Sequence, residues 1–531
     1  MFRTLCAHFA RRLIRSGGED ASDLDMSLGV SLALLASPGV LMALGLMNKY
    51  SSLLRYVRGV PIVEDPYPRA VGDGYSLLVF SMAITGFVTL WKWDRILPDP
   101  IDHLNLAPLP IPPHRLFLAS LTAVLLVTAV FILDVNAGSL FVFPMVVTAD
   151  QGSVVPFLRL TAAHLVVLLL GSAFTFCACF GLMGLLVLLA PAVWFTRLSI
   201  AVRAGAGALL LLLWIYSKDG HAWLRFTRDG TAAWQQWIPS VWFASLYGPL
   251  IGRPDLGVEI LWQRGLWALA LAAFCTFGSY SLGYRRGMSG GLLRSAHRRR
   301  WPQWLLRQGG NSLERAAFRF TMLTLWRSER HSMLILTITG VGLVVGVTHG
   351  DLSQLPFYVA FSLIAAIRVA LQVPASAPAN WPFRLLAVTV RNEPVRVARR
   401  ILWIHCGLFA ALPTLMLCRW ADSFTLILLS LLLIEGLLLN FRQIPCTVRP
   451  AGFRNTRLVY ALFGLLGLAI FPAVGAHIAS RIAVQPLRAV IPLAFAAVLL
   501  HYRERAAEAF ASGMPPLVFD DTADDVIRLR L

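Results

Sequence analysis

Apolar stretches of membrane-spanning length constrain this chain more than any other feature of its sequence. An α-helix needs about 20 mostly apolar residues to cross the hydrocarbon core of a bilayer. Stretches of that kind recur along almost the whole chain, and we predict twelve spans from them. They cover residues 27–47, 75–93, 116–135, 158–195, 200–216 and 262–284, and then 332–348, 355–373, 401–418, 422–440, 458–476 and 484–501.

The composition agrees with this interpretation. Only 14% of the 531 residues are charged and 57% are hydrophobic, whereas a soluble protein has about 25% charged residues. Such a chain is not disordered, and it is neither a disulfide-rich secreted module nor an ordinary soluble enzyme. The sequence therefore predicts an all-α, polytopic integral membrane protein.

The positive charges indicate how the spans are oriented. The net charge is +19, and 33 of the 47 Lys and Arg fall in alternate connecting segments if the N-terminus is cytoplasmic. An excess of Lys and Arg marks cytoplasmic loops, so we expect a multi-pass protein of the plasma (inner) membrane with both termini in the cytoplasm. The arginines lie between apolar runs rather than on a solvated basic face, so binding to nucleic acid is not expected.

The stretch at 158–195 leaves one alternative open. It is long enough for a single tilted helix or for a tight helical hairpin. A hairpin would place residues 285–331, which contain 11 Arg, on the outer side. The charge distribution therefore favours one helix here and twelve helices as two six-helix halves.

The order of segments suggests that the two halves are duplicated. Basic amphipathic sequences, "HFARRLIRS" and "RFTMLTLWRSERH", precede the first span of each half, and a Trp-, Pro- and Arg-containing inner loop follows the second span of each. The predicted organisation is an N-terminal amphipathic elbow segment (1–26), a first membrane half (27–284), a basic cytoplasmic linker with a second elbow helix (285–331), a second membrane half (332–501) and a cytoplasmic tail (502–531). The outer segment 217–261 is expected to form short helices.

No catalytic or cofactor site is predicted within the chain. A nucleotide-hydrolysing P-loop ends in Gly-Lys-Ser/Thr, and none of the three lysines, Lys49, Lys92 and Lys218, has that context. No two histidines are three or four residues apart, so no helical zinc pair is expected. Ser289 in "GMSGG" lacks the strand–turn–helix setting of a nucleophile elbow. We therefore expect a transport subunit and no enzyme, cofactor or metal site in this chain.

Ionisable residues inside predicted spans are candidates for function, because charge is costly in a bilayer. The two clearest are Glu435 and Arg368, each about five residues from the inner end of its span. Glu435 is expected either to pair with an arginine or to be protonated. Four further residues lie nearer the ends of their spans and are weaker candidates: Asp134, His164, His405 and His477.

The two inner loops are the predicted docking surface for a partner, and their sequences carry a family resemblance. The segment "DHLNLAPLPIPPHR" is similar to an Asp…Pro-Leu-Pro…Arg stretch of ABC-2 type exporter permeases, and "ANWPFR" resembles a block in a bacterial group of duplicated permease-like proteins. The order of elbow helix, spans, inner loop and bulky outer segment is also similar to that family. The candidate docking residues are Asp102, Pro108, Leu109, Pro110, Arg115, Trp381, Arg384 and Arg396.

The resemblance implies an exporter energised by a separate P-loop ATPase chain, which would supply the ATP and Mg²⁺ site. The substrate would be a lipid, a hydrophobic compound or a peptide, and membrane lipids would be partners. The second half departs from the family pattern, because residues 477–483 leave almost no outer segment between its last two spans.

Two other classes of function remain open. Twelve spans in two halves also suit an ion-coupled secondary transporter, although the chain offers few buried acids for coupling. A membrane-embedded enzyme is the third possibility, and it would depend on a polar residue such as Ser289.

Overall fold

The structure is a computed structural model. It describes residues 2–14, 37–59, 65–96, 111–217, 233–288, 312–349, 353–373, 375, 393–438, 441, 444–447 and 457–512.

The described residues are helical almost throughout, and no β-strand occurs among them. They divide into two compact units, one extending up to Met288 and one running from Ser312 to Ser512. Among the described residues, eight helical segments are long and apolar enough to cross a membrane: Tyr67–Trp91, His114–Gln151, Val154–Leu189, Arg197–Tyr216, Glu259–Leu282, Glu329–Thr348, Trp420–Leu438 and Leu466–Val484. The all-α class and the presence of several potential membrane helices are thus confirmed. The number twelve and its division into two six-helix halves stay predictions.

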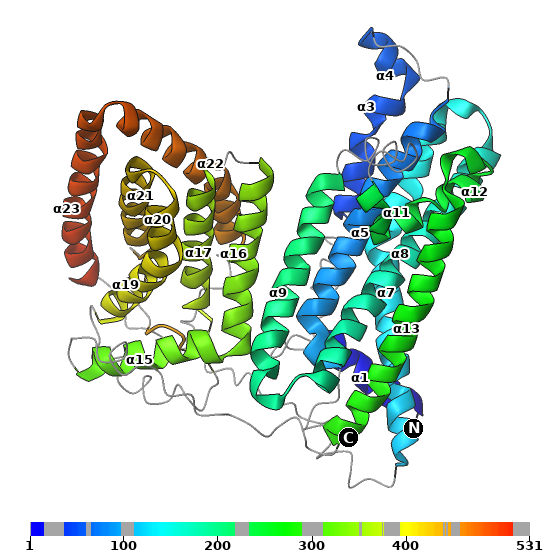
Figure 1. Ribbon diagram of the computed structural model, residues 1–531, viewed down its shortest axis with the longest axis horizontal. Helices are drawn as coiled ribbons and strands as arrows, with labels where there is room; N and C mark the ends of the chain where they lie inside the picture. The colour runs from blue at the N-terminus through cyan, green and yellow to red at the C-terminus, as the bar shows by residue number, and fades with distance from the viewer. Residues whose placement is uncertain are drawn as a thin grey trace. The chain divides into compact units, whose positions relative to one another are not determined.

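Unit 1 is built around one central helix. Its long helices are α5 (Tyr67–Ile96), α7 (Pro113–Thr148), α8 (Val154–Leu189), α9 (Ala192–Tyr216) and α13 (Glu259–Met288), as seen in Figure 1. Helix α8 packs against α5, α7 and α13. Its sequence is apolar on all sides, which is the pattern of a helix surrounded by other helices.

The structure decides between one helix and a hairpin at 158–195. Helix α8 is continuous over Val154–Leu189, and its N-terminus is capped by Ser153, whose Oγ accepts a hydrogen bond from the backbone N–H of Val155. It ends just before Pro191, which lacks a backbone N–H and begins the next helix, α9. The interpretation as a single helix is confirmed, with its end at residue 189 rather than 195.

The predicted N-terminal elbow contains helix α1 (Phe2–Ile14). Leu5 and Phe9 are buried in a cluster with side chains of α7, α8 and α13, whereas Arg3 and Arg11 are exposed. This division between an apolar and a charged face is the expected amphipathic pattern.

Short helices also form between α9 and α13, as predicted for the outer segment. The described part contains η3 (Ala233–Trp237), α11 (Pro239–Ala244), α12 (Tyr247–Ile251) and η4 (Pro254–Leu256). Prolines begin two of them, and Gly252 adopts φ +74° after α12, a backbone conformation that favours glycine. Helix α11 packs among α5, α8 and α13, so this segment fills space inside the bundle.

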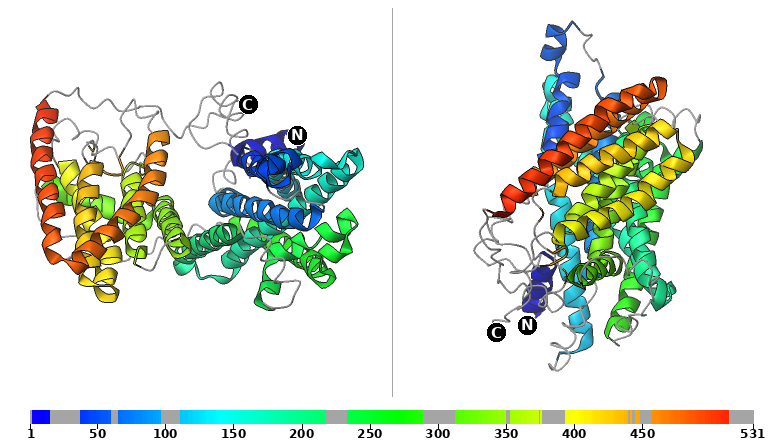
Figure 2. Two further views of the ribbon diagram at one scale, coloured as in Figure 1. Left: turned by 90° about the horizontal axis from the view of Figure 1, so that it is seen from above. Right: turned by 90° about the vertical axis from the view of Figure 1, so that its left-hand side faces the viewer.

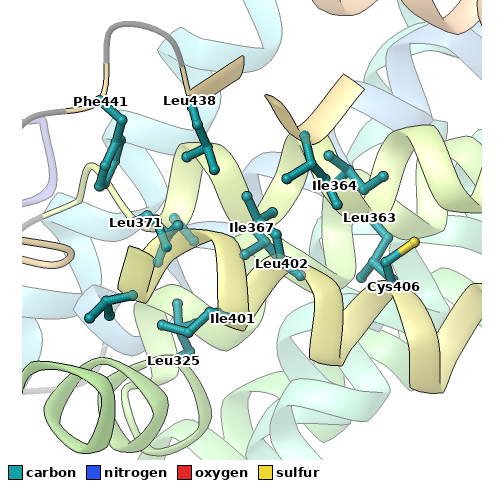
Figure 3. Close-up of a cluster of buried hydrophobic side chains, with 14 of the residues drawn as sticks. Leu325, Leu363, Ile364, Ile367, Leu371, Ile401, Leu402, Cys406, Leu438 and Phe441 are labelled. Atoms are coloured by element: carbon teal, nitrogen blue, oxygen red, sulfur yellow. The ribbon is translucent and has the colours of Figure 1, made fainter. Parts of the chain in front are cut away.

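Unit 2 is arranged around helix α17 (Leu355–Ala370), which is buried along most of its length between α16 (Glu329–His349), α21 (Trp420–Leu438) and α22 (Arg457–Val484). Helix α15 (Ser312–Arg327) and helix α19 (Glu393–Cys406) close the core at one end. Figure 3 shows side chains of α15, α17 and α19 meeting there with Leu438 and Phe441. Helix α23 (Val490–Ser512) packs beside α21 and lies at the edge of the unit, coloured red in Figure 2.

Helices α15 and α16 form an elbow. The first ends at Arg327, and the second begins at Glu329 after a break at Ser328. Helix α15 lies crosswise at the N-terminal end of α16 rather than in line with it (Figure 1). The second elbow helix, predicted from the sequence "RFTMLTLWRSERH", is therefore present.

The predicted span 401–418 is interrupted. It consists of the end of α19, a π-helical turn over Gly407–Ala411, and helix α20 (Leu412–Leu417). Pro413 has no N–H to donate to the carbonyl of Phe409, and its ring would clash with that carbonyl in a regular α-helix. The wider turn relieves the clash, as π-bulges commonly do at such points.

Two other predicted spans correspond to shorter apolar helices. Helix α17 has 16 residues, and the segment Pro486–Tyr502 combines the turn η8 (Pro486–Ala489) with the first part of α23. Within the predicted first span, residues 37–45 are helical.

Candidate functional site

Four of the predicted functional residues lie among the described residues. Arg115 is exposed near the start of α7, Arg368 lies in the last turn of α17, Arg396 lies in α19, and Glu435 lies in α21. The others, Asp102, Pro108, Leu109, Pro110, Trp381 and Arg384, lie outside the described residues.

Three of these four belong to a group of charged side chains in unit 2, which we call the charge cluster. Helices α15, α17, α19 and α21 supply its members, which are Glu314, Arg368, Arg396, Arg399, Arg400 and Glu435. Charged side chains are rarely buried unless they are paired, and the ion pairs of Glu314 and Glu435 follow that rule.

Glu435 is paired with an arginine, one of the two states expected from the sequence. Arg399 Nε lies 2.7 Å from Glu435 Oε1, and Arg399 Nη2 donates to Oε2 at 3.1 Å. The Glu435 side chain is 8% exposed, whereas that of Arg399 is 34% exposed. This ion pair includes a charge-assisted hydrogen bond, which is stronger than a hydrogen bond between neutral groups, and it joins α19 to α21.

Arg368 binds the end of a neighbouring helix. Its Nε donates to the carbonyl oxygen of Leu437 at 2.9 Å, and its guanidinium lies 4.7 Å from the ring centroid of Phe441. The last carbonyls of a helix lack partners within the helix and attract positive charge. Arg368 therefore stabilises the C-terminus of α21, close to Glu435 in the sequence of that helix.

Glu314 was not predicted from the sequence. Its side chain is 2% exposed, and its carboxylate lies 2.9 Å from Arg396 Nε and 3.6 Å from Arg400 Nη2. One signal in the sequence was available: Glu314 shares a helical face with Ala317, Phe318 and Thr321, which are buried. A carboxylate on the apolar face of an amphipathic helix is expected to have a cationic partner.

The charge cluster therefore holds α19 from two sides. Arg396 and Arg400 bind the elbow helix α15, while Arg399 binds α21. Helix α19 begins directly after the second predicted docking loop, and Arg396 was itself a docking candidate.

Aromatic side chains provide a second link between α15 and α19. Trp326 Nε1 donates to His405 Nε2 at 3.1 Å, and His405 Nδ1 donates to the carbonyl oxygen of Ile401 at 2.7 Å. An indole is only a donor and a carbonyl only an acceptor, so these contacts fit the neutral tautomer with the proton on Nδ1. Phe409 of the π-helical turn packs beside both rings.

Unit 1 contains a buried polar group of a different kind. His164 of α8 and Tyr247 of α12 form a hydrogen bond of 2.5 Å between Nδ1 and Oη, and both side chains are almost fully buried. Gly74 of α5 lies against Tyr247: a Cβ atom at Gly74 would be 2.8 Å from the Tyr247 hydroxyl. Beside them, Ser240 Oγ donates to Tyr75 Oη at 3.1 Å.

The end of unit 1 near α3 (Met47–Tyr50) is held by an ion pair that also involves a tyrosine. Lys49 Nζ lies 2.7 Å from Asp73 Oδ1, and Tyr50 Oη donates to Asp73 Oδ2 at 2.5 Å. Burial, and then the nearby Asp73 carboxylate, raise the pKa of Tyr50. The hydroxyl therefore stays protonated and remains a donor to the carboxylate.

The position of Asp134 corrects the expectation from the sequence. It was expected near the end of span 116–135, but α7 runs on to Thr148, so Asp134 lies near the middle of a helix of 36 residues. Its Oδ2 is buried and has no hydrogen-bond partner among the described residues. The apolar run extends past Asp134 through "AGSLFVFPMVV", which hydropathy alone had separated from it.

Among the described residues, no group of three or more His, Cys, Asp or Glu is placed to hold a metal ion. A comparison of the chain with protein-family models, curated proteins and solved structures finds no match.

Proposed function

We propose that this chain is the membrane-spanning permease subunit of an ATP-driven exporter of the ABC-2 type, located in the plasma (inner) membrane of a bacterium. A separate P-loop ATPase would hydrolyse ATP with Mg²⁺ and dock on the inner loops of the permease. The helical architecture, the two amphipathic elbow helices and the motifs of the inner loops support the proposal.

The observation that carries the proposal is the attachment of α19 within unit 2. This helix follows the loop that contains Trp381 and Arg384, and ion pairs fix it to α15 and α21. A subunit driven by a partner needs a stiff connection between its docking loop and its membrane helices. Ion pairs to buried carboxylates supply such stiffness, because breaking them leaves an uncompensated buried charge.

The same contacts suggest how movement would be transmitted. A push on the loop before Glu393 would shift α19 along its length, and the paired Glu314 and Glu435 would carry α15 and α21 with it. The π-helical turn at Gly407–Ala411 is the point where α19 and α20 can bend relative to each other.

The first experiment is to purify the full chain gently from its native membranes and to identify the proteins that accompany it. We expect a P-loop ATPase to accompany the chain in a stoichiometric amount. Its rate of ATP hydrolysis should be higher in the complex than in the isolated ATPase. Replacing residues 102–112 with a Gly/Ser linker of equal length should release the ATPase. The same replacement at 219–229, predicted to lie on the other side of the membrane, is the matched control and should leave the complex intact.

A chain that purifies alone and does not stimulate ATP hydrolysis would contradict the proposal. Loss of the ATPase with both linker replacements would also count against docking on the first inner loop, since it would indicate general disruption.

A second experiment separates docking from transmission. Glu314→Gln weakens the contacts of Arg396 and Arg400 with α15 and leaves the sequence of both docking loops unchanged. We expect the ATPase to remain bound while substrate export, measured in proteoliposomes, falls several-fold relative to ATP hydrolysis. Export that stays in proportion to hydrolysis would contradict the proposed path through α15.

An ion-coupled secondary transporter is the alternative that specific residues favour. Glu435 and Asp134 are acids inside long apolar helices, and such residues often mark proton or ion pathways. Uptake into liposomes driven by a proton gradient, and its loss in Glu435→Gln, would support this alternative. ATP-dependent export that persists in Glu435→Gln, even at a reduced level, would support the exporter.

A further inference from the structure

The exposed face of helix α15 carries a compact pattern of charge and aromaticity. Arg315, Arg319 and Trp326 are all exposed, and their spacings of four and eleven residues place them on one side of the helix. The opposite side, which includes Ala317, Phe318 and other apolar residues, is buried in the core of unit 2. Arg315 and Arg319 lie outside that core, and Trp326 is partly exposed while its ring packs against His405 of α19.

The positive charge of this face is not neutralised from within the helix. Glu314 is the one acidic residue in the sequence of α15, and its carboxylate is turned inward to Arg396 and Arg400. Arg315 and Arg319 make no ion pair with any of the described residues. The face therefore presents two guanidinium groups to whatever lies against it.

Trp326 is held in place at the other end of the face. Its indole N–H is bound to His405 Nε2, and its ring stacks on His405 at a centroid distance of 5.7 Å. The side chain nevertheless remains 44% exposed. A fixed, half-exposed tryptophan is typical of the boundary between the headgroups and the acyl chains of a bilayer.

The geometry suits a phosphate group at that boundary. Residues four apart on a helix are about 5–6 Å apart at Cβ, so both guanidinium groups can reach one phosphate. Arginine binds phosphate in a two-point geometry that lysine does not reproduce. Helix α15 lies across the foot of α16 (Figure 1), so it runs along the membrane surface when α16 crosses the bilayer.

We propose that the face formed by Arg315, Arg319 and Trp326 binds the headgroup of an anionic phospholipid. The two arginines bind the phosphate, and Trp326 with the neighbouring Leu323 contacts the upper part of the acyl chains. Trp326 favours a lipid over a free anion, because a dissolved phosphate ion has no acyl chain that could pack against the Trp326 ring. The inference is independent of whether an ATPase partner exists.

The test measures which lipid stays with the protein. The full chain is purified in mixed micelles containing equal amounts of dioleoylphosphatidylglycerol and dioleoylphosphatidylcholine, and the lipids retained are quantified by mass spectrometry. We expect the wild-type chain to retain the anionic lipid in preference. An arginine near an anionic membrane surface contributes about fivefold in affinity. We therefore expect R315Q/R319Q to reduce the preference for the anionic lipid by a factor between about 5 and about 30.

The matched control removes two positive charges elsewhere in unit 2. Arg481 and Arg488 are exposed near the end of α22, and R481Q/R488Q should leave the preference unchanged. A conservative variant, R315K/R319K, keeps the charge but loses the two-point geometry and should retain an intermediate preference. Equal losses in R315Q/R319Q and R481Q/R488Q would overturn the proposal, since only net charge would then matter.

Competition distinguishes the lipid from a free anion. Adding 10 mM inorganic phosphate should not displace the retained phosphatidylglycerol from the wild-type chain. Displacement by phosphate, or the absence of any preference for the anionic lipid in the wild-type chain, would overturn the proposal. All variants should give the same elution profile as the wild type, because the substituted side chains are exposed.

Discussion

The two units of this chain hold their buried polar groups in different ways. In unit 1, the buried contacts are mostly neutral hydrogen bonds such as those of His164 with Tyr247 and Ser81 with Ser172. In unit 2, buried carboxylates pair with arginines that reach the surface. Neutral pairs in a membrane helix bundle are weak individually, whereas a buried charge depends strongly on its partner. Unit 1 should therefore tolerate single losses that unit 2 does not.

The largest effect is expected from Arg399→Ala. This change leaves the Glu435 carboxylate buried without its partner and should lower the free energy of unfolding by about 3–5 kcal/mol. Glu435→Gln should cost only about 1 kcal/mol, because Arg399 is 34% exposed and can turn to water. Denaturant titration of the full chain in micelles, followed by tryptophan fluorescence, measures both.

A double variant checks the reason for that asymmetry. Replacing both Arg399 and Glu435 with Met removes the pair without leaving a buried charge, so most of the stability lost in Arg399→Ala should return. Equal effects of Arg399→Ala and Glu435→Gln would show that burial of the carboxylate is not what distinguishes this unit.

The next effect tests the packing of unit 1. Gly74→Ala places a methyl group 2.8 Å from the ring and hydroxyl of Tyr247, closer than atoms normally approach. Overpacking of this kind should lower the free energy of unfolding by about 2–3 kcal/mol. Gly205→Ala in α9 is the matched control, since no atom lies within 4 Å of its added Cβ, and it should be neutral or stabilising.

A smaller effect is expected from Tyr247→Phe. The change removes the hydroxyl that binds His164 Nδ1 and leaves a buried ring nitrogen without a partner. We expect a loss of about 1–2 kcal/mol, measured by the same titration. His164→Phe combined with Tyr247→Phe should lose less than the sum of the single changes, and strict additivity would argue against a direct hydrogen bond.

The smallest effect concerns a bond between two serines in the interior of unit 1. The Oγ atoms of Ser81 and Ser172 are 2.6 Å apart, and Ser81→Ala should cost about 0.6 kcal/mol, the average for hydrogen bonds between membrane helices. The expected result is a fall of about one or two degrees in the midpoint of thermal unfolding. A loss as large as that of Arg399→Ala would remove the difference between the units.

The sequence by itself determined the class of the protein and the position of most helices. Apolar runs and interspersed arginines suffice for that, because the bilayer requires long apolar helices whatever their partners. The elbow helix before Glu329 and the short helices after Ala233 also followed from local patterns. The single helix at 154–189 was favoured by the charge distribution, although its predicted end at residue 195 lay beyond the end at Leu189.

The tertiary structure alone decided which charges meet. Glu435 and Arg368 stand out in the sequence because they interrupt apolar runs, yet nothing local shows that the first binds Arg399 and the second binds the end of α21. Glu314 was missed because a glutamate in an Arg-rich amphipathic helix resembles a solvated residue until α19 is packed against it. Hydrophobicity is a property of each segment, whereas an ion pair depends on where two distant segments are brought together, and only the packed fold fixes that distance.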